Sequence, residues 1–358
     1  MKGKIKILIV VGARPNFIKI APIFSKLKKY KNIKSLLVHT GQHYDFEMSS
    51  IFFKELNIPE PDYNLEVGSG SHAWQTAKTM ERLEPLLFHE KPYLLIVVGD
   101  VNSTLAGALT AAKSHIPVAH IEAGLRGFNK QMPEEINRVL TDHISDFLFC
   151  PTKTAVLNLK KEGIVKGVFN TGDIMYDVFL KMIKIATKKS EILRKMNLEP
   201  KKYYLATLHR AENTEDREVF KNIINVFSEI KNLIFPCHPR TEKLLKKYNL
   251  LGKLKKKIRI IKPVGYIDML WLEKNAQKIL TDSGGMQKEA YFLGVPCITL
   301  RDETEWVETV RDKWNILVGH NKRKIIEAVK FFNPSEPRFK HYGDGKAADN
   351  IIKIIINN

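Results

Sequence analysis

The stretch TDSGGMQKE, residues 281–289, decides how the rest of this chain is interpreted. It follows the short apolar run 278–280 and precedes an apolar helical pattern at 290–293, so Ser283 and the two glycines should lie where a strand passes into a helix. Ser283 is suited to cap that helix, and glycine lets backbone N–H groups approach a ligand at the positive end of the helix dipole. The stretch is therefore typical of an anion site, but an ordinary strand-to-helix turn explains it equally well.

Strand and helix patterns alternate on both sides of this stretch. In the first half we predict helices at 15–30 and 47–56, an irregular loop at 57–72, and strands at 5–11, 35–40, 93–98, 117–121 and 147–150. In the second half we predict strands at 203–208, 233–236, 259–262, 278–280 and 295–300, and a last helix at 347–356. Such alternation is typical of parallel sheets with helices on both faces, and 358 residues suffice for two domains of roughly 150–200 residues each.

The composition is that of a globular protein with a basic surface. Hydrophobic residues make up 44% of the chain, charged residues make up 27%, and the formal net charge is +19. The lysines are dispersed and no aromatic-interleaved basic motif accompanies them, which favours a solvated surface over a nucleic-acid face. The first apolar run stops after seven residues and no run is long enough to span a membrane. We therefore expect a cytoplasmic protein with no membrane partner.

Neither a metal site nor a disulfide framework is predicted. Cys150, Cys237 and Cys297 stand alone at the ends of apolar runs, without CxxC spacing. No HxH or HExxH spacing links the histidines, and no GxSxG motif of a serine hydrolase is present.

Polar residues follow most of the predicted strands, and ligands of doubly wound sheets bind beyond the carboxyl ends of strands. They are Arg14, Gln42 with His43, Asp100 and Glu122 in the first half, and His209, His238 and Ser283–Gly285 in the second. Two facing sheets would bring these residues to one cleft. Loops after strands are polar in any case, so the pattern alone does not identify a reaction.

Arg14 lies in GARPNFIK (12–19), which resembles a phosphate-facing turn at the start of a helix. The segment lacks both GxGxxG and GxxxxGK[ST], so NAD or ATP is not supported as a cofactor. A solvated loop cation is the alternative interpretation of Arg14.

Three carboxylates are candidates for proton transfer. Asp100 and Glu122 each follow a predicted strand, and carboxylates that share a cleft can raise one another's pKa toward the range that proton abstraction from carbon requires. Glu134 begins a predicted helix, where the helix dipole or an i,i+4 salt bridge to Arg138 explains it equally well. Beyond the second-half strands, His209 with Arg210 and His238 with Arg240 suit anionic oxygens.

Eight motifs, in order and with their spacing, resemble the non-hydrolysing UDP-N-acetylglucosamine 2-epimerases over nearly the whole chain. They are GARPNFIK (12–19), GQHYD (41–45), VGDVNSTLAGAL (98–109), HIEAGLR (120–126), MPEEINRVLTDH (132–143), HRAEN (209–213), HPRT (238–241) and TDSGG-QKEA (281–290). The chain is identified as a member of that family.

The resemblance implies a glycosyltransferase-B-type α/β fold of two Rossmann-like domains, with the active site in the interdomain cleft, and a homodimer. The implied domains are 1–172, joined by the C-terminal helix 346–358, and a UDP-binding domain at 173–345. The implied enzyme is an isomerase of polysaccharide biosynthesis that interconverts UDP-N-acetylglucosamine and UDP-N-acetylmannosamine. It eliminates UDP to give a 2-acetamidoglucal and adds UDP back, with no NAD or metal cofactor.

The resemblance also implies roles for individual residues. Asp100, Glu122 and Glu134 would be the acid/base carboxylates, and His209 would act beside the departing diphosphate. Ser283, Gly284 and Gly285 would hold phosphate and Glu289 the ribose. The remaining implied substrate-binding residues are Arg14, Lys19, His43, Arg138, His238, Arg240 and Met269.

Three departures from the family pattern keep the exact sugar open. Trp306-Val307 stands where many members carry Arg-Pro, Ala211 replaces a second arginine, and the loop 67–72 lacks an arginine that some members use for activation by a second UDP-sugar. A UDP-2,3-diacetamido-glucuronate or another modified UDP-hexosamine is the nearest alternative substrate. A UDP-sugar glycosyltransferase shares the architecture, and an RNA-binding protein is supported by charge alone.

Overall fold

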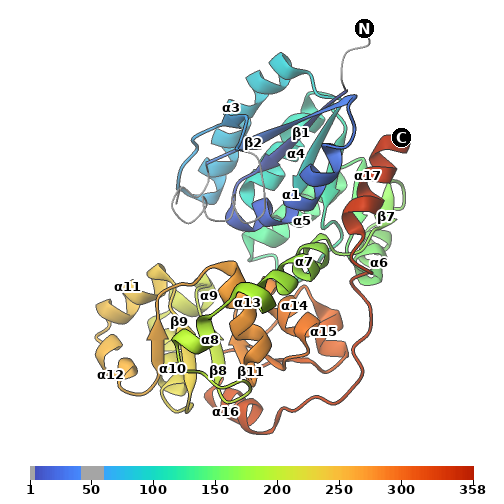
Figure 1. Ribbon diagram of the computed structural model, residues 1–358. Coiled ribbons are helices and arrows are strands. Elements are labelled where there is room, and N and C mark those ends of the chain that lie inside the picture. Colours follow the sequence, from blue (N-terminus) through green and yellow to red (C-terminus); the bar gives the residue numbers. More distant parts are fainter. Residues whose placement is uncertain (1–4, 42–59) are drawn as a thin grey trace. The chain divides into compact units, whose positions relative to one another are not determined.

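Two parallel sheets, one in each of two units, form the framework of the chain (Figure 1). The structure is a computed structural model that describes residues 5–41 and 60–358. Unit 1 extends to Leu180 and resumes at Lys340, and unit 2 spans Lys181–Phe339. The predicted fold class, two doubly wound α/β sheets, is confirmed.

The first strand illustrates why the sheet of unit 1 forms. In β1 (Ile5–Val11), Leu8 and Val10 pack into one hydrophobic cluster, and Ile7 and Ile9 face the other side because strand side chains alternate. A strand that is apolar on both faces is typical of a parallel sheet covered by helices on both sides. Ile9 pairs with β2 on one side and with β4 on the other, which places β1 in the middle of the sheet.

The sheet of unit 1 has the strand order β3-β2-β1-β4-β5-β6-β7 in the described part of the chain. Its other strands are β2 (Ile33–His39), β3 (Tyr63–Asn64), β4 (Leu94–Val98), β5 (Val118–Ile121), β6 (Phe147–Cys150) and β7 (Val168–Asn170). Its helices are α1 (Arg14–Leu27), α3 (His72–Glu90), α4 (Asn102–Lys113), α5 (Pro133–His143), α6 (Lys153–Lys161) and α17 (Ala347–Asn357). Helix α7 (Ile174–Lys189) carries the chain from unit 1 into unit 2.

The last helix of the chain, α17, belongs to unit 1 and packs on α1. Ile351 and Ile352 are buried in this packing, and Lys26 Nζ lies 2.5 Å from Asp349 Oδ1. At the start of α17 the carboxylate of Asp177 accepts the N–H groups of residues 347 and 348, at 3.1 and 2.8 Å. These bonds satisfy two N–H groups that a helix start leaves without intrahelical partners.

Unit 2 repeats the topology of unit 1, with the strand order β10-β9-β8-β11-β12-β13. Its strands are β8 (Tyr204–Thr207), β9 (Leu233–Pro236), β10 (Arg259–Ile261), β11 (Lys278–Thr281), β12 (Cys297–Thr299) and β13 (Asn315–Leu317). Its helices are α8 (Ile192–Lys195), α9 (Ala211–Thr214), α10 (Arg217–Phe227), α11 (Pro239–Lys247), α12 (Leu251–Lys255), α13 (Tyr266–Asn275), α14 (Gly284–Leu293), α15 (Val307–Arg311) and α16 (Lys322–Phe331).

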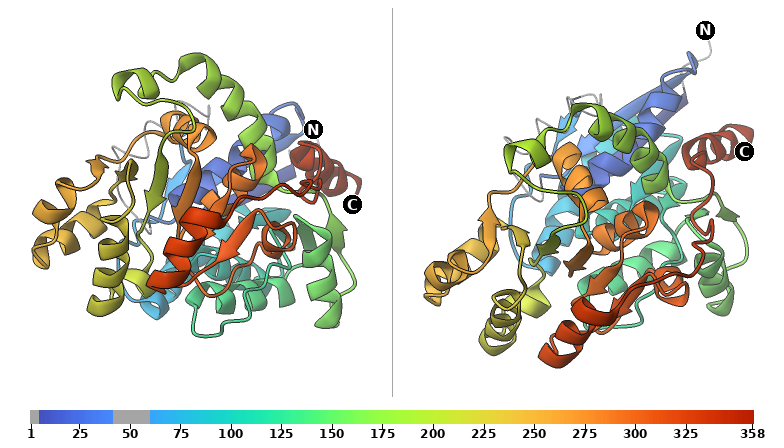
Figure 2. Two further views of the ribbon diagram at one scale, coloured as in Figure 1. Left: turned by 90° about the horizontal axis from the view of Figure 1, so that it is seen from below. Right: turned by 60° about the horizontal axis from the view of Figure 1, so that its bottom comes forward.

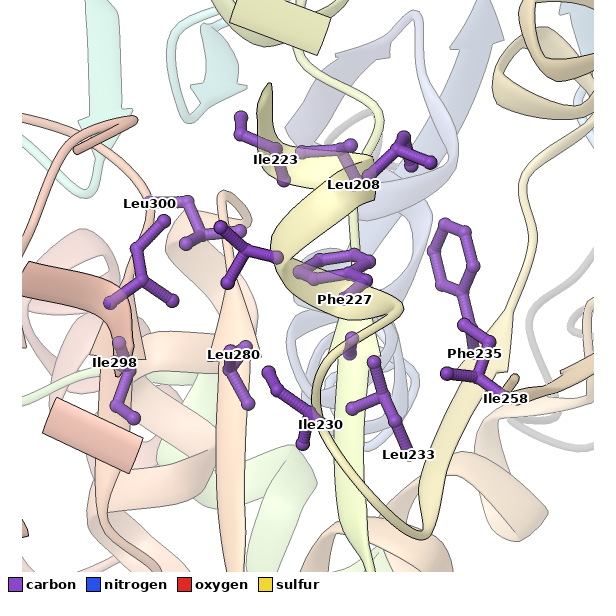
Figure 3. Close-up of a cluster of buried hydrophobic side chains, with 14 of the residues drawn as sticks. Leu208, Ile223, Phe227, Ile230, Leu233, Phe235, Ile258, Leu280, Ile298 and Leu300 are labelled. Atoms are coloured by element: carbon purple, nitrogen blue, oxygen red, sulfur yellow. The ribbon is translucent and has the colours of Figure 1, made fainter. Parts of the chain in front are cut away.

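Two hydrophobic clusters lie on the two faces of the unit 2 sheet. In the first, Phe227 of α10 packs edge-on against Phe235 of β9, with ring centroids 5.5 Å apart (Figure 3). The second cluster joins α13 and α14 to the opposite face through Leu272, Met286 and Ala290. Helices therefore cover both faces of this sheet, as the two further views of the ribbon also show (Figure 2).

The strand order identifies where each unit can bind a ligand. The strands β2 and β3, which follow β1 in the sequence, lie on one side of it, and β4 lies on the other side. In unit 2, β9 and β10 lie on one side of β8, and β11 lies on the other. Loops beyond the carboxyl ends of such adjacent strands leave a crevice between them, and this is where doubly wound sheets bind ligands. The loops after β1, β4, β8 and β11 contain Arg14, Asp100, His209 and Ser283.

Several elements were not predicted from the sequence. Strand β3 interrupts the predicted irregular loop 57–72, and the segment after residue 300 contains α15, β13 and α16. Helices α8, α9 and α12 were also missed, and α1 ends at Leu27 instead of residue 30. The predicted helix at 47–56 lies outside the described residues.

Candidate active site

Asp100, directly after β4, is held by contacts on its side chain and its backbone. Its Oδ2 accepts from Arg138 Nη2 at 2.7 Å and from Arg138 Nε at 3.0 Å. Its backbone carbonyl accepts from the Asn137 side chain at 2.9 Å. Both donors lie on α5, so this helix fixes the position of the carboxylate.

Glu122, directly after β5, pairs with Lys19 of α1. Only 4% of the Glu122 side chain and 14% of the Lys19 side chain are exposed. Glu122 has a φ of +73°, a left-handed conformation that costs roughly 1–2 kcal/mol for a residue with a Cβ. Strain of this kind persists only where the surroundings impose it, and it is concentrated at functional sites.

Gly99 lies between these two carboxylates. Its φ is +71°, and a Cβ at this position would lie 3.1 Å from Lys19 Nζ and 3.6 Å from Glu122 Oε2. The loop after β4 and the loop after β5 therefore approach one another closely here. We call Lys19, Asp100, Glu122 and Arg138 the carboxylate rim.

Charges of the carboxylate rim determine how Asp100 ionises. Burial raises the pKa of Asp100, but the positive charges of Arg138 and Lys19 outweigh burial and hold this pKa below its ordinary value. Glu122 raises the pKa of Asp100, as the sequence indicated, but the two cations outweigh this effect, so the expected net rise toward neutrality is wrong for Asp100.

An i,i+4 salt bridge to Arg138 was one structural explanation of Glu134, and the observed ion pairs of Arg138 do not support it. Arg138 instead bonds Asp100 and, through Nη1, the carboxylate of Glu135 at 2.7 Å. Glu135 also accepts the N–H groups of residues 127 and 128, so it is the structural acid of this helix start. Glu134 is half-buried and has no ion pair with any described residue.

A buried network beneath the rim was missed by sequence reasoning. His120 of β5 is fully buried, and its two ring nitrogens lie 2.7 Å from Asp142 Oδ1 and 2.8 Å from the Gly99 carbonyl oxygen. Asp142 also bonds Arg126, which forms a two-pronged pair with Glu162. The available signal was a histidine inside an otherwise apolar strand, two positions before Glu122.

The corresponding edge of unit 2 is organised by the buried carboxylate of Asp282. Its Oδ2 accepts the backbone N–H groups of His209 and Arg210, at 3.0 and 2.9 Å. The His209 ring lies close as well, with Nδ1 3.5 Å from Asp282 Oδ1, and 40% of this side chain is exposed. Asp282 thus fixes the loop after β8 to the end of β11.

The predicted strand-to-helix turn at Ser283 is confirmed. Ser283 caps α14, and its Oγ accepts the N–H group of Met286 at 3.4 Å. A Cβ on Gly284 would lie 2.3 Å from Glu305 Oε1, whereas a Cβ on the exposed Gly285 would approach no atom closer than 3.9 Å. Gly284 therefore permits close packing inside the protein, and Gly285 leaves one side of the helix start open. We call His209, Asp282, Ser283, Gly284 and Gly285 the N–H rim.

Trp306, identified from the sequence as a departure, lies beside this helix start. Its Nε1 would be 3.3 Å from a Cβ on Gly284, and the side chain is buried. Lys288 Nζ lies 3.8 Å from the centre of the Trp306 ring, a distance typical of a cation–π interaction. Trp306 replaces the arginine that many family members carry here. In this structure the buried side chain of Lys288 places a cation beside residue 306.

Glu289 of α14 is buried near the carboxyl group of Glu273. Tyr266 donates a hydrogen bond to Glu289 Oε1 at 2.5 Å. Burial raises the pKa of the neighbouring Glu273 well above its ordinary value, and the charge of Glu289 raises it further. Met269 lies on the same helix as Tyr266 and Glu273 and packs against the hydrophobic cluster of α13 and α14.

The remaining predicted residues lie as follows. The His238 ring is 5.9 Å from the His209 ring, between centroids, and His238 Nδ1 caps α11. Arg240 is exposed and bonds Glu215 at 2.9 Å. Arg14 is the first residue of α1, and His43 lies outside the described residues.

Within residues 5–41 and 60–358, no group of three or more His, Cys, Asp or Glu side chains is placed to hold a metal ion. No helix in this part of the chain is both long enough and apolar enough to cross a membrane. The three cysteines are buried, and burial raises the pKa of the Cys237 thiol to about 12. These thiols are therefore protonated and unreactive at neutral pH.

Comparison with known proteins places these features in a family. The family model described as UDP-N-acetylglucosamine 2-epimerase matches residues 25–356. A Methanococcus maripaludis protein named UDP-N-acetylglucosamine 2-epimerase homolog is 55% identical over 98% of this chain and 99% of its own. The UDP-2,3-diacetamido-2,3-dideoxy-D-glucuronate 2-epimerase of Pseudomonas aeruginosa is 44% identical over 98% of this chain and 99% of its own. The crystal structure of Methanocaldococcus jannaschii UDP-GlcNAc 2-epimerase in complex with UDP-GlcNAc and UDP has a TM-score of 0.92 and 50% identity, covering 99% of this chain and 100% of that chain.

Proposed function

This chain belongs to the UDP-N-acetylglucosamine 2-epimerase family, and we propose that it interconverts UDP-N-acetylglucosamine and UDP-N-acetylmannosamine at C2 of the sugar. The enzyme is an isomerase. In the forward direction a base removes the C2 proton while the C1–O bond to UDP breaks, which leaves a 2-acetamidoglucal and free UDP. In the second step a proton adds to the opposite face of C2 and UDP bonds C1 again, so that no atom is gained or lost.

The observation that supports this function best is the pair Asp100 and Glu122. They lie on adjacent loops beside Gly99, and each has its own cation, Arg138 or Lys19. Two carboxylates with separate electrostatic environments can hold different protonation states, as removal of a proton from one face and delivery to the other require. Glu134 is the third candidate for these roles.

The N–H rim suits the departing diphosphate. The first N–H groups of α14 lie at the positive end of a helix dipole, and Gly285 leaves room for an oxyanion. The half-exposed His209 ring supplies a further donor at the same edge. Because the C2 proton is weakly acidic, stabilisation of the leaving diphosphate must provide much of the lowering of the barrier. Glu289 is assigned to the ribose, and Arg14, Lys19, His43, His238, Arg240 and Met269 to further substrate contacts.

Incubation with UDP-N-acetylglucosamine in deuterated water tests the proposed reaction. We expect UDP-N-acetylmannosamine with deuterium at C2, formed without an acceptor. Sugar transfer only in the presence of an acceptor would indicate a glycosyltransferase, and the absence of C2 exchange across several UDP-hexosamines would contradict epimerisation.

A modified UDP-hexosamine is the second candidate substrate. It is favoured by the 44% identical relative named for a diacetamido-glucuronate and by Trp306 with Lys288 beside Gly284. Wild type and Trp306→Arg are to be compared on a panel of neutral and uronate UDP-hexosamines. A change in the ratio of their kcat/KM values would assign sugar selection to this position, and an unchanged ratio would exclude it.

A homodimer in the cytoplasm is the proposed assembly and location. Sedimentation velocity at micromolar concentration distinguishes a dimer from the 41.1 kDa monomer. A purely monomeric profile with full activity would contradict the proposed assembly.

A further inference from the structure

We propose that His120 is a positioning residue, a buried imidazolium that holds the loops of Asp100 and Glu122 in fixed relation to each other. The inference rests on the proposed function for the acid/base roles of those two carboxylates. It adds a residue that touches neither substrate nor reacting atoms and acts through Gly99 and Asp142.

The hydrogen-bond partners of His120 require both ring nitrogens to carry protons. The Gly99 carbonyl oxygen, 2.8 Å from Nε2, can only accept. Asp142, 2.7 Å from Nδ1, also accepts the N–H group of Gly124 at 3.0 Å and Arg126 Nη1 at 2.7 Å. A carboxyl group that receives these two donors, one of them a guanidinium, is ionised and therefore also only accepts.

The charge on Asp142 agrees with this assignment. Burial raises the pKa of Asp142, but the nearby His120 and Arg126 outweigh burial and lower it below the ordinary value. Beyond Asp142, Arg126 bonds both oxygens of Glu162 at 2.7 Å. The network thus contains two cations and two carboxylates, which meets the requirement that buried charges be paired.

His120 joins the two loops that carry the acid/base carboxylates. On one side its Nε2 holds the carbonyl of Gly99, whose N–H group donates to Ile121 at 3.0 Å, so that both ends of the residue before Asp100 are fixed. On the other side Asp142 holds Gly124, two residues after Glu122. Glu122 is therefore confined between His120 and Gly124, and this explains how its left-handed backbone conformation is maintained.

The imidazolium also adds a fixed positive charge next to the carboxylate rim. A nearby cation favours the ionised form of a carboxyl group, so loss of His120 is expected to raise the pKa of the catalytic base. A purely structural residue would not shift the pH profile of catalysis in this manner.

Nitrogen-15 NMR of the histidine-labelled wild-type enzyme tests the protonation directly. The His120 signals are assigned by their loss in His120→Gln. We expect two ring N–H signals, one bonded to the Gly99 carbonyl oxygen and one to Asp142. A single ring N–H would overturn the proposal, and this readout does not depend on activity.

Kinetics of His120→Gln test the positioning role. We expect kcat to fall roughly 100-fold, with the Kd of UDP within about twofold of wild type and the acid limb of the kcat profile moved to higher pH. His143→Gln is the matched control, since His143 is an exposed histidine next to Asp142 in sequence that bonds only a carbonyl of its own helix closely. An unchanged kcat and pH profile would refute the inference. If His120→Gln does not fold, His120→Asn replaces it in the kinetics and in the assignment of the NMR signals.

A failure of the proposed function gives a different outcome from a failure of this inference. If the proposed function is wrong, wild type itself exchanges no C2 proton on any UDP-hexosamine. If only the inference is wrong, wild type is active and His120 shows one ring N–H.

Discussion

Units 1 and 2 have the same strand order, apart from the additional edge strand β7 of unit 1, but present different chemistry at the carboxyl ends of their strands. The carboxylate rim of unit 1 consists of buried and partly buried side chains held in ion pairs, such as Glu122 with Lys19. The N–H rim of unit 2 keeps its carboxylate, Asp282, buried beneath backbone N–H groups and leaves the His209 ring half exposed. One scaffold thus presents paired carboxylates in one unit and backbone N–H groups in the other, which under the proposed function would transfer protons and bind the diphosphate, because function depends on the loops and not on the sheet.

The largest expected effect comes from neutralising a carboxylate of the carboxylate rim, which leaves the N–H rim unchanged. Asp100→Asn and Glu122→Gln should each lower kcat by roughly 10³-fold or more, since each removes an acid/base group. Calorimetric titration should still detect UDP binding of near-normal affinity, because the N–H rim is untouched. If either variant retains near-normal turnover, that carboxylate is not catalytic.

The second prediction concerns the cation that serves Asp100. In Arg138→Met the pKa of Asp100 rises, because burial and the charge of Glu122 both raise it and are then opposed by the weaker contribution of Lys19 without that of Arg138. A base with a lowered pKa is active above that pKa and loses activity as the pH falls through it, so the acid limb of the kcat profile should move to higher pH. We expect turnover at pH 6 to fall roughly tenfold or more.

The control for Arg138→Met is Glu135→Gln, which leaves the bonds between Arg138 and Asp100 in place. Its acid limb should coincide with that of wild type. A shift in both variants, or in neither, would show that Arg138 does not set the ionisation of Asp100.

The third prediction separates packing from binding in the N–H rim with two adjacent glycines. Gly285→Ala should stabilise the free protein by roughly 0.5–1 kcal/mol, because alanine loses less entropy in a helix and its Cβ has space. The same methyl group lies where an oxyanion must approach, so the Kd of UDP should rise roughly tenfold, which is about 1.4 kcal/mol.

Gly284→Ala should behave in the opposite way. Its Cβ would lie 2.3 Å from Glu305 Oε1, and the other oxygen of this carboxylate, Oε2, is held by Arg301 at 3.1 Å, so we expect a loss of roughly 1–3 kcal/mol in the free protein. Thermal unfolding and calorimetry of both variants give the comparison. If Gly285→Ala is destabilised and binds UDP with normal affinity, the diphosphate does not bind at this helix start.

The smallest expected effect concerns the buried pair of Glu273 and Glu289. The folded-state pKa of Glu273 is raised, first by burial and then by Glu289, so its neutral form is favoured in the folded protein. The stability contribution of this group is present below its unfolded-state pKa and is lost as the pH rises toward the folded-state value. Glu273→Gln removes this dependence and should be more stable than wild type by about 1 kcal/mol at pH 7.5 but not at pH 4.5, measured by urea unfolding. An equal difference in the free energy of unfolding at the two pH values would contradict this prediction.

Sequence patterns predicted the elements whose signal is local. Strand β1 was predicted with its observed ends because five consecutive apolar residues, 7–11, follow Ile5 and Lys6 and lead into Gly12. The cap at Ser283 was predicted because capping depends on neighbours within one turn. Strand β13, three residues long, and helix α15, five residues long, were missed because such short elements carry too few residues for a period to be recognised.

The sequence yielded a set of candidate site residues, whose roles stay predictions, but not the pairs that these residues form. Spacing on α5 suggested Glu134 with Arg138, yet Arg138 reaches Asp100, which is 38 positions away. His120 and Asp142 are 22 positions apart and meet only because β5 and α5 pack together. Such pairings depend on tertiary packing, which no local pattern contains, and they decide the electrostatics of the rim.

The return of the chain to unit 1 through α17 has a consequence for translation. Residues 181–339 of unit 2 are contiguous, so the ribosome has completed their sequence before it adds the helix that covers α1. Synthesis of unit 1 begins before that of unit 2 but ends after it. The hydrogen bonds from the N–H groups of residues 347 and 348 to Asp177 can form only after α17 has been synthesised. A messenger truncated near its end therefore yields a complete unit 2 attached to a unit 1 with an uncovered apolar face, a natural target for quality-control proteases.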